Sequence, residues 1–396
     1  MKDDYDVIVV GAGPAGCIAA QTAAAECDVL LIEKRQEIGS PVRCGEAVGR
    51  QELLEFLGSA ADPKWIASEI NAARVNAPDG TTVDFSGEMF HREDPLGYIL
   101  ERKIFDRELA KNAARAGADV MVRTRATGLI IEHGVVKGVT MNWLGEELAV
   151  RSRVVIGADG VESQVGRWGG INTTLKLKDI ISCAQYHLDN VDVLDRTMDF
   201  YIGSQYSPGS YAWIFPKGDH AANVGLAVLG SKITDKRPVD YLNEFVADKF
   251  PDGQPVEFVV GGVPLSEGLK TMTSDGLMLV GDAARLTDQL TGEGIMEGLS
   301  SGTTAGTVAC KAVQQKDASM KVLREYETEY NGNYFGRQRK FAHRAKELFV
   351  HRSDEELNRM VRAVHDIRVE EVTMKGIIIR LLKNDPKLLL MIRHLL

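Results

Sequence analysis

Glycines and one acid near the start of the chain have the types and spacing that nucleotide binding needs. In the run Gly11-Ala-Gly-Pro-Ala-Gly16, the first glycine permits a tight turn, Gly13 lets the backbone approach a pyrophosphate, and Gly16 lets a helix pack closely on a strand. The positive N-terminus of a helix that begins at Pro14 would attract the phosphate charge. Glu33 would then accept hydrogen bonds from ribose hydroxyls.

The elements around these residues support that interpretation. Residues 6–10 form an apolar run that predicts a strand, the Ala-rich stretch after Gly16 predicts a helix, and residues 29–32 predict a second strand that ends at Glu33. A dinucleotide-binding motif requires this order, with an acid about twenty residues after the glycines. The alternative is an ordinary strand, turn and helix with Glu33 on the surface.

The composition is that of a globular chain with room for two domains. Of its 396 residues, 44% are hydrophobic and 26% are charged. The first strand is predicted close to Met1, so we expect no signal peptide, and no apolar run reaches the roughly eighteen residues that predict a membrane span. Five cysteines without C-x-x-C spacing argue against a disulfide framework or a metal site and favour the cytoplasm. The net charge of −9 argues against a nucleic-acid partner.

The order of the predicted elements indicates a mixed fold, α/β and α+β, in which two domains interleave. Alternating residues predict antiparallel strands at 69–85 and 180–263, whereas 154–160 and 276–284 predict strands that return to the first, parallel sheet. We expect a Rossmann-like nucleotide domain from 1–68, 101–170 and 271–325, an antiparallel-sheet substrate domain from 69–100 and 171–270, and a helical C-terminal region at 326–396.

Three separated segments resemble the FAD-dependent superfamily typified by p-hydroxybenzoate hydroxylase. They are the glycine loop with Glu33, the run Gly157-Ala-Asp-Gly-Val-Glu-Ser163, and the run Gly281-Asp-Ala-Ala284, and the resemblance spans about residues 5–310. It implies non-covalent FAD, with Asp282 on the ribityl hydroxyls and a helix N-terminus at Gly294 directed at the flavin. The cofactor-binding residues that it implies are Gly11, Gly13, Ala15, Gly16, Glu33, Lys34, Arg43, Cys44, Gly45, Ala47, Arg102, Ala126, Asp159, Asp282, Gly292, Gly294 and Ile295.

Two further segments resemble the geranylgeranyl reductases, and among them the archaeal enzymes that act on glycerophospholipids. Pro208-Gly-Ser-Tyr-Ala-Trp-Ile-Phe-Pro216 is similar to their P-x-x-Y-x-W-x-F-P motif, and Pro41-Val-Arg-Cys-Gly-Glu46 resembles the cysteine loop that they place beside the flavin. One departure is Gly225-Leu-Ala227, which keeps only the first glycine of the family's G-x-G. The missing second glycine bears on whether the backbone at 225–227 can approach a neighbouring group closely.

An extended strand at 211–216 would place Tyr211, Trp213 and Phe215 on one face, because side chains alternate along a strand. Such a face suits an isoprenoid chain, which offers only apolar surface, and we expect Tyr206 to join it in binding substrate. The alternative is that the face is only part of the core.

The resemblance implies a reductase that saturates the C=C bonds of geranylgeranyl chains on archaeal membrane lipid precursors by hydride transfer from reduced FAD. The catalytic candidates are Cys44, Tyr211 and Trp213, with Cys44 as proton donor or, alternatively, a small buried apolar residue. The electron donor is either reduced ferredoxin or NAD(P)H.

Two other functions are compatible with the motifs. An FAD-dependent aromatic hydroxylase shares the superfamily, whereas halogenation is disfavoured because the Lys of a halogenase motif is missing. A non-catalytic prenyl-lipid carrier is the third candidate, but Asp282 and Gly292-Glu-Gly294 favour a working flavin site.

The end of the chain differs in charge from the rest. Residues 332–396 hold 14 Lys and Arg against 8 Asp and Glu, and the runs 377–383 and 388–396 combine apolar residues with basic ones. This pattern suits peripheral contact with the inner face of the cell membrane, or helices that cap the substrate domain.

Overall fold

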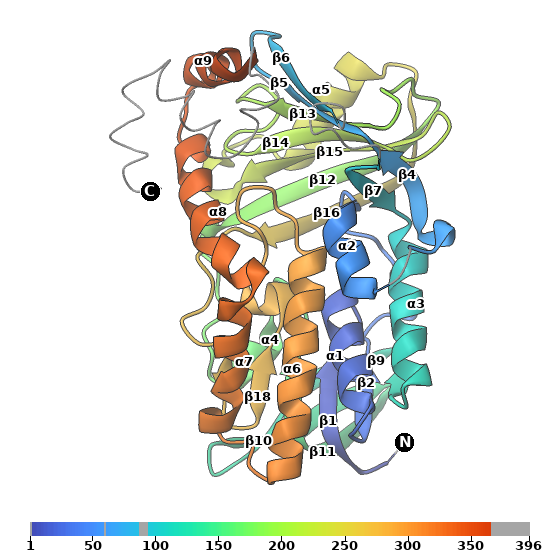
Figure 1. The fold of residues 1–396 in the computed structure, drawn as a ribbon, viewed down its shortest axis with the longest axis vertical. Helices are drawn as coiled ribbons and strands as arrows, with labels where there is room; N and C mark the ends of the chain where they lie inside the picture. Colours follow the sequence, from blue (N-terminus) through green and yellow to red (C-terminus); the bar gives the residue numbers. More distant parts are fainter. Residues whose placement is uncertain (1, 59–60, 87–93, 366–396) are drawn as a thin grey trace. The chain divides into compact units, whose positions relative to one another are not determined.

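A computed structural model describes residues 2–58, 61–86 and 94–365, and the chain divides into two compact units. The first unit comprises Met1–Val42, Arg102–Leu175 and Pro264–Lys340. The second unit comprises Arg43–Glu101, Lys176–Val263 and Phe341–Leu396. Figure 1 shows both units and labels many of their helices and strands. Each unit is therefore assembled from three separate stretches of chain, and the predicted interleaved α/β and α+β fold class is confirmed.

The first unit is built on a mostly parallel sheet. Its strands follow the order β17, β18, β11, β1, β2, β8, and neighbours from β18 to β8 run parallel. The antiparallel strands β9 and β10 extend from β11 as a meander. The bounds are β1 Asp4–Val10, β2 Val29–Ile32, β8 Asp119–Met121, β9 Thr124–Glu132, β10 Val135–Trp143, β11 Glu146–Gly157, β17 Thr273–Ser274 and β18 Leu277–Leu279.

Helices pack on this sheet through apolar residues and, where two helices approach closely, through glycine. Val7–Val10 are all buried, as expected for a central strand covered on both faces. Helix α1 lies between α3 and α6 in Figure 1. A Cβ at Gly302 of α6 would lie 2.3 Å from the Ala15 carbonyl oxygen of α1, so the close approach of the two helices requires glycine there. The bounds are α1 Pro14–Ala24, α3 Arg102–Arg115, α4 Gln164–Trp168, α6 Ile295–Gln315 and α7 Met320–Gly332.

The second unit is built on a seven-stranded sheet in the order β16, β12, β15, β14, β13, β5, β6. The pairs from β12 to β13 are antiparallel, and β13 pairs in parallel with β5. Helix α5 (Pro238–Lys249) covers one face, where Phe245 packs with Ala212 and Ile214. The bounds are β5 Ala72–Asn76, β6 Thr82–Ser86, β12 Ile180–Asp189, β13 Thr197–Ile202, β14 Tyr211–Pro216, β15 Ala222–Leu229 and β16 Gln254–Pro264.

A small three-stranded sheet changes the expected assignment of residues 43–68. Strand β7 (Gly97–Leu100) lies between β3 (Ala47–Gly49) and β4 (Ile66–Ile70), and both pairs are antiparallel. Helix α2 (Arg50–Leu57) follows β3 directly. These pairings place 43–68 in the second unit, whereas the sequence analysis assigned them to the nucleotide domain.

The C-terminal helices do not form one region of their own. Helix α7 packs on α6 in the first unit. Helix α8 (Tyr334–Val350) leads to α9 (Asp354–His365), which packs on β6 through Val361 in the second unit. The basic apolar runs at 377–383 and 388–396 lie outside the described residues. No helix in the described part of the chain is long and apolar enough to cross a membrane.

Candidate functional site

The glycine loop has the backbone geometry that a bound phosphate needs. Gly11 has a φ of +107°, and a Cβ there would lie 2.3 Å from the Ala158 carbonyl oxygen. A Cβ on Gly16 would lie 1.8 Å from the Gly11 carbonyl oxygen, so turn and helix meet in contact. A Cβ on Gly13, in contrast, would meet no described atom within 4 Å. The loop is therefore tightly built and open at the position where the sequence predicts the pyrophosphate.

Glu33 is buried and ties this loop to β2. One carboxylate oxygen accepts a hydrogen bond from the Ala12 amide at 3.0 Å, and the other accepts one from the Arg35 amide at 2.9 Å. Its exposed fraction is 9%, which excludes the alternative of a surface acid. A carboxylate oxygen has two lone pairs, so both oxygens can also accept bonds from a ligand hydroxyl.

Asp282 stands next to the start of helix α6. It lies in a short 3₁₀ turn, Gly281–Ala284, and a Cβ on Gly294 would be 3.2 Å from its Oδ1 atom. Burial raises the pKa of the Asp282 carboxyl, while a hydrogen bond from Thr287 and the positive charge of Arg102 oppose that rise. The Arg102 guanidinium is itself held by Asp106 at 2.7 and 2.8 Å. Asp282, Gly294 and Arg102 thus belong to one neighbourhood.

Within the described residues, Asp159 has one carboxylate oxygen with a hydrogen-bond partner and one without. Its Oδ2 accepts a hydrogen bond from the Val165 amide at 3.0 Å, but its Oδ1 is buried without a hydrogen-bond partner among the described residues. Burial raises the pKa of this carboxyl. An unpaired buried acceptor costs free energy, so this one fits a site that a ligand completes.

The remaining predicted cofactor residues take varied positions. Ala15 lies in the first turn of α1, Lys34 is exposed after Glu33, and Ala126 lies on β9. Gly292, with a φ of +76°, precedes α6, and Ile295 is buried at its start. The open glycine loop, the three acids and the α6 N-terminus without a side-chain cap fit FAD, which buried Glu33 and half-buried Asp159 and Asp282 would help to hold. Arg43, Cys44, Gly45 and Ala47 belong to the second unit.

We expect Asp282→Ala and Glu33→Ala to bind FAD about 10- to 100-fold more weakly, because each loses hydrogen bonds to a charged acceptor. The ratio of flavin absorbance to protein absorbance in the purified protein measures the FAD content. Fluorescence titration of the apoprotein with FAD measures the affinity. Glu132→Ala removes an exposed carboxylate of the same unit that pairs with Arg151, and it should retain FAD as wild type does. Full FAD content and unchanged affinity in both site variants would refute the assignment.

Three aromatic side chains of β14 form a row on one face of the second sheet. The ring centroids of Tyr211 and Trp213 are 5.8 Å apart, and those of Trp213 and Phe215 are 6.2 Å apart. Phe200 of β13, which the sequence analysis missed, contacts both Tyr211 and Phe215 edge to face. Since Ala212 and Ile214 face α5, the row has the alternation that the sequence predicted.

Tyr206 lies outside this aromatic row, and its part in substrate binding stays a prediction. Its ring centroid is 4.9 Å from that of Phe245 on α5, and its hydroxyl donates to Asp248 at 2.7 Å. The residue lies in the turn before β14, where strand alternation does not decide the direction of a side chain. It packs with the core between the sheet and α5.

The cysteine loop packs directly on the aromatic row. A Cβ on Gly45 would lie 2.8 Å from the Phe215 ring, so this contact requires glycine. Gln185, a residue that the sequence analysis missed, accepts a hydrogen bond from the Trp213 indole at 3.0 Å and donates one to the Cys44 carbonyl at 3.1 Å. The Glu46 amide donates to the Cys44 sulfur at 3.2 Å.

A second thiol lies near Cys44. Burial raises the pKa of the Cys183 thiol to about 12, and the Cys44 thiol adds to the rise. Cys183 stands on β12, two residues before Gln185, and no local pattern marked either residue.

The structure explains why one glycine is enough at the position of the family's G-x-G motif. A Cβ on Gly225 would lie 2.4 Å from the Trp213 indole, so the first glycine is the one that the aromatic row needs. Ala227, at the position of the second glycine, is buried, and its carbonyl accepts a hydrogen bond from Ser207. The close backbone approach is therefore kept with a single glycine.

A network of ion pairs and hydrogen bonds around Lys217 also holds the cysteine loop in place. The Lys217 ammonium is 2.7 Å from Glu46, 2.9 Å from Glu101 and 2.9 Å from the Leu100 carbonyl oxygen. Asn223 donates a further hydrogen bond to Glu46 at 2.7 Å. Every partner in this network lies in the second unit, so the loop and β14 form one local structure.

Comparisons with known proteins find two family models that match this chain. A family model described as the geranylgeranyl reductase catalytic domain matches residues 179–263, and one described as FAD dependent oxidoreductase matches residues 6–186. A structure of a geranylgeranyl bacteriochlorophyll reductase-like protein from Thermoplasma acidophilum covers all of both chains at 38% identity, with a TM-score of 0.93. A flavin-dependent brominase, 20% identical over 96% of this chain and 94% of its own, has a TM-score of 0.72 and shares the fold alone.

Curated relatives match over nearly the whole chain. The digeranylgeranylglycerophospholipid reductase of Methanocella arvoryzae is 50% identical over 98% of both chains. The reductase of the same name from Methanosarcina mazei is 47% identical over 98% of this chain and 95% of its own. Together with the FAD-type glycine loop and the aromatic row, these matches show that the protein belongs to the digeranylgeranylglycerophospholipid reductases, a family of FAD-dependent oxidoreductases.

Proposed function

We propose that this protein saturates the C=C bonds of geranylgeranyl chains on archaeal membrane glycerophospholipid precursors. The observation that carries the proposal is the packing of the Cys44–Glu46 loop on the row of Tyr211, Trp213 and Phe215. This arrangement joins a thiol loop to an apolar aromatic face, which is what a long polyene without polar groups requires. The names of the relatives supply the lipid class.

The chemistry asks three things of the protein. When bound and reduced, FAD supplies the hydride. An isolated alkene has no carbonyl oxygen to stabilise. The protein therefore has to orient the double bond, exclude water and deliver a proton. Positive charge that develops on the more substituted carbon is stabilised by aromatic faces, and the Trp213 ring is held for this role by Gln185 and by the close approach of Gly225.

The two alternative functions, an aromatic hydroxylase and a non-catalytic lipid carrier, predict different results in an oxygen-free assay. Chemically reduced protein mixed with lipid in an oxygen-free cuvette should regain the absorbance of oxidised flavin as the alkene takes up electrons. A hydroxylase would stay reduced until oxygen enters, and a carrier would show no oxidation that depends on lipid. The same cuvette distinguishes the two candidate electron donors when each is added separately, since only the true donor, reduced ferredoxin or NAD(P)H, should bleach the oxidised flavin.

We further propose that the basic apolar end of the chain brings the protein to the inner face of the cell membrane. Wild type should sediment with anionic vesicles and less with neutral ones, because Lys and Arg near a charged surface each contribute about 1 kcal/mol. Deletion of residues 376–396 should abolish this binding and leave the FAD content unchanged. Sedimentation of the deleted protein at the wild-type level would count against the docking role.

A further inference from the structure

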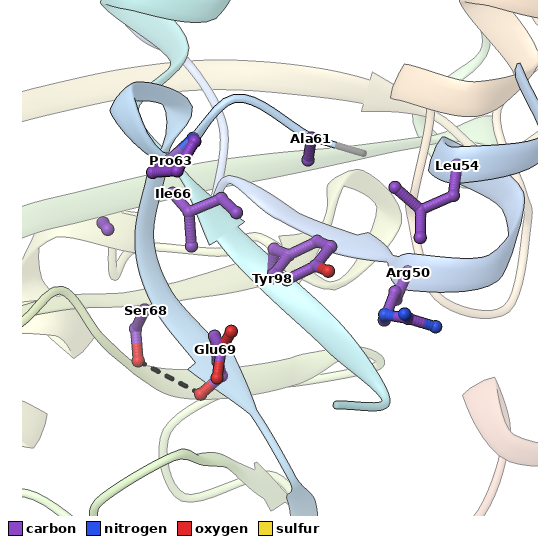
Figure 2. A pocket seen from close by; sticks show the side chains of 9 residues that line it. Arg50, Leu54, Ala61, Pro63, Ile66, Ser68, Glu69 and Tyr98 are labelled. Carbon is purple, nitrogen blue, oxygen red and sulfur yellow. Dashed lines mark hydrogen bonds between the residues drawn. The ribbon is translucent and has the colours of Figure 1, made fainter. Parts of the chain in front are cut away.

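A cavity of about 450 Å³ opens in the second unit beside α2, β4 and β7 (Figure 2). Leu54 and Ile66 give it an apolar side. Arg50 and Ser68 contribute polar atoms, as does Tyr98, whose ring stands in the middle of the view in Figure 2. Such a mixture suits a ligand that is polar at one end and apolar at the other.

Two stretches of chain connect this cavity to the aromatic row. Gly45, which packs on Phe215, is five residues before Arg50, a span of at most about 18 Å. On the other side, Gly218 follows Phe215 by three residues, and a Cβ there would lie 3.9 Å from the carbonyl oxygen of Ala67, which lines the cavity. The cavity therefore lies near the Phe215 end of the row.

Arg50 is the one positively charged residue among the described lining residues. Its guanidinium is 3.2 Å from Asp94, a carboxylate that is 68% exposed. Exposed ion pairs of this kind contribute little free energy, so a ligand anion can replace Asp94 at small cost. The acidic lining residue Glu69 is already paired with Arg196. An anion in the cavity would thus be attracted by Arg50, while the negative charge of Glu69 is already balanced by Arg196.

We propose that this cavity holds the phosphate headgroup of the lipid substrate and that the Arg50 guanidinium binds it. The inference rests on the proposed function and adds the part of the substrate that the aromatic row leaves unrecognised. Guanidinium presents a planar fork of donors that matches phosphate oxygens in pairs, which an ammonium group cannot do. A lipid whose isoprenoid chain lies along the row would place its polar end at this cavity.

The test compares two lipids on the FAD-loaded enzyme: digeranylgeranylglyceryl phosphate and the same diether with a free hydroxyl group instead of phosphate. Arg50→Gln should lower kcat/KM for the phosphate lipid by about 10- to 100-fold, through KM, with kcat and the neutral lipid unaffected. Arg50→Lys should recover part of the loss. Arg74→Gln is the matched control, because Arg74 pairs with exposed Asp84 in the same unit and does not line the cavity.

The outcomes separate this inference from the proposed function. If wild type reduces neither lipid, the proposed function fails. If wild type reduces both but Arg50→Gln keeps the wild-type ratio of the two lipids, the headgroup inference is overturned. It is also overturned if Arg50→Gln loses activity equally on both lipids.

Discussion

Replacing Cys44 by serine should slow lipid saturation by about 10²–10⁴-fold while FAD content and reduction of the flavin stay at the wild-type level. The family resemblance implies that the cysteine loop faces the flavin, and the loop packs on the aromatic row through Gly45. A thiol can donate a proton in an apolar site where a carboxylate would be costly to desolvate. Loss of the thiol therefore removes the proton and leaves cofactor binding intact.

Single-turnover reduction of lipid by pre-reduced enzyme, without oxygen, measures this step alone. Cys183→Ser is the matched control, because Cys183 is a half-buried thiol close to Cys44 that carries no proposed role. Product formation at the wild-type rate in Cys44→Ser would make Cys44 a small buried residue of the loop. Tyr211 or a bound water would then be the next proton donor to test.

Replacing Lys217 by methionine should lower the free energy of unfolding by about 3–5 kcal/mol. The Lys217 side chain is 4% exposed and faces both Glu46 and Glu101. Without the ammonium group, the carboxylate of Glu46, itself 7% exposed, loses its cation while still buried. The cost arises from that uncompensated charge rather than from the lost attraction alone.

Urea unfolding of the variants measures the effect, and a double variant identifies its cause. Lys217→Met combined with Glu46→Gln should be more stable than Lys217→Met alone, because the buried charge is gone. Arg74→Met, which breaks the exposed pair with Asp84, should cost less than about 1 kcal/mol. A double variant no more stable than Lys217→Met would show that the charge of Glu46 is not the cause.

Local patterns predicted the parts of the molecule whose geometry is local. The β1, glycine loop, α1 and β2 order follows from the apolar runs and the spacing of Gly11, Gly13 and Gly16, since each of these elements is set by residues close together in the sequence. The row of Tyr211, Trp213 and Phe215 follows from the two-residue period of a strand.

Long-range pairings decided what the sequence did not show. Strand β3 is three residues long, and its partner β7 lies about fifty residues further along, so no local period marked the chain near Ala47 as part of the second unit. Gln185 and Lys217 are ordinary polar residues until the fold brings them to the cysteine loop. Their roles depend on partners that only the tertiary structure supplies.

Mass spectrometry of the lipid after anaerobic incubation with chemically reduced protein tests the central claim most directly. We expect digeranylgeranylglyceryl phosphate to gain two hydrogen atoms for each double bond reduced, in proportion to the flavin that is reoxidised. In heavy water, both hydrogen atoms added to each double bond should appear in the product as deuterium, because the proton donor and the hydride-donating N–H of reduced flavin both exchange with solvent. Recovery of the lipid at its original mass from wild-type protein that holds fully reduced FAD would contradict the assignment as a reductase.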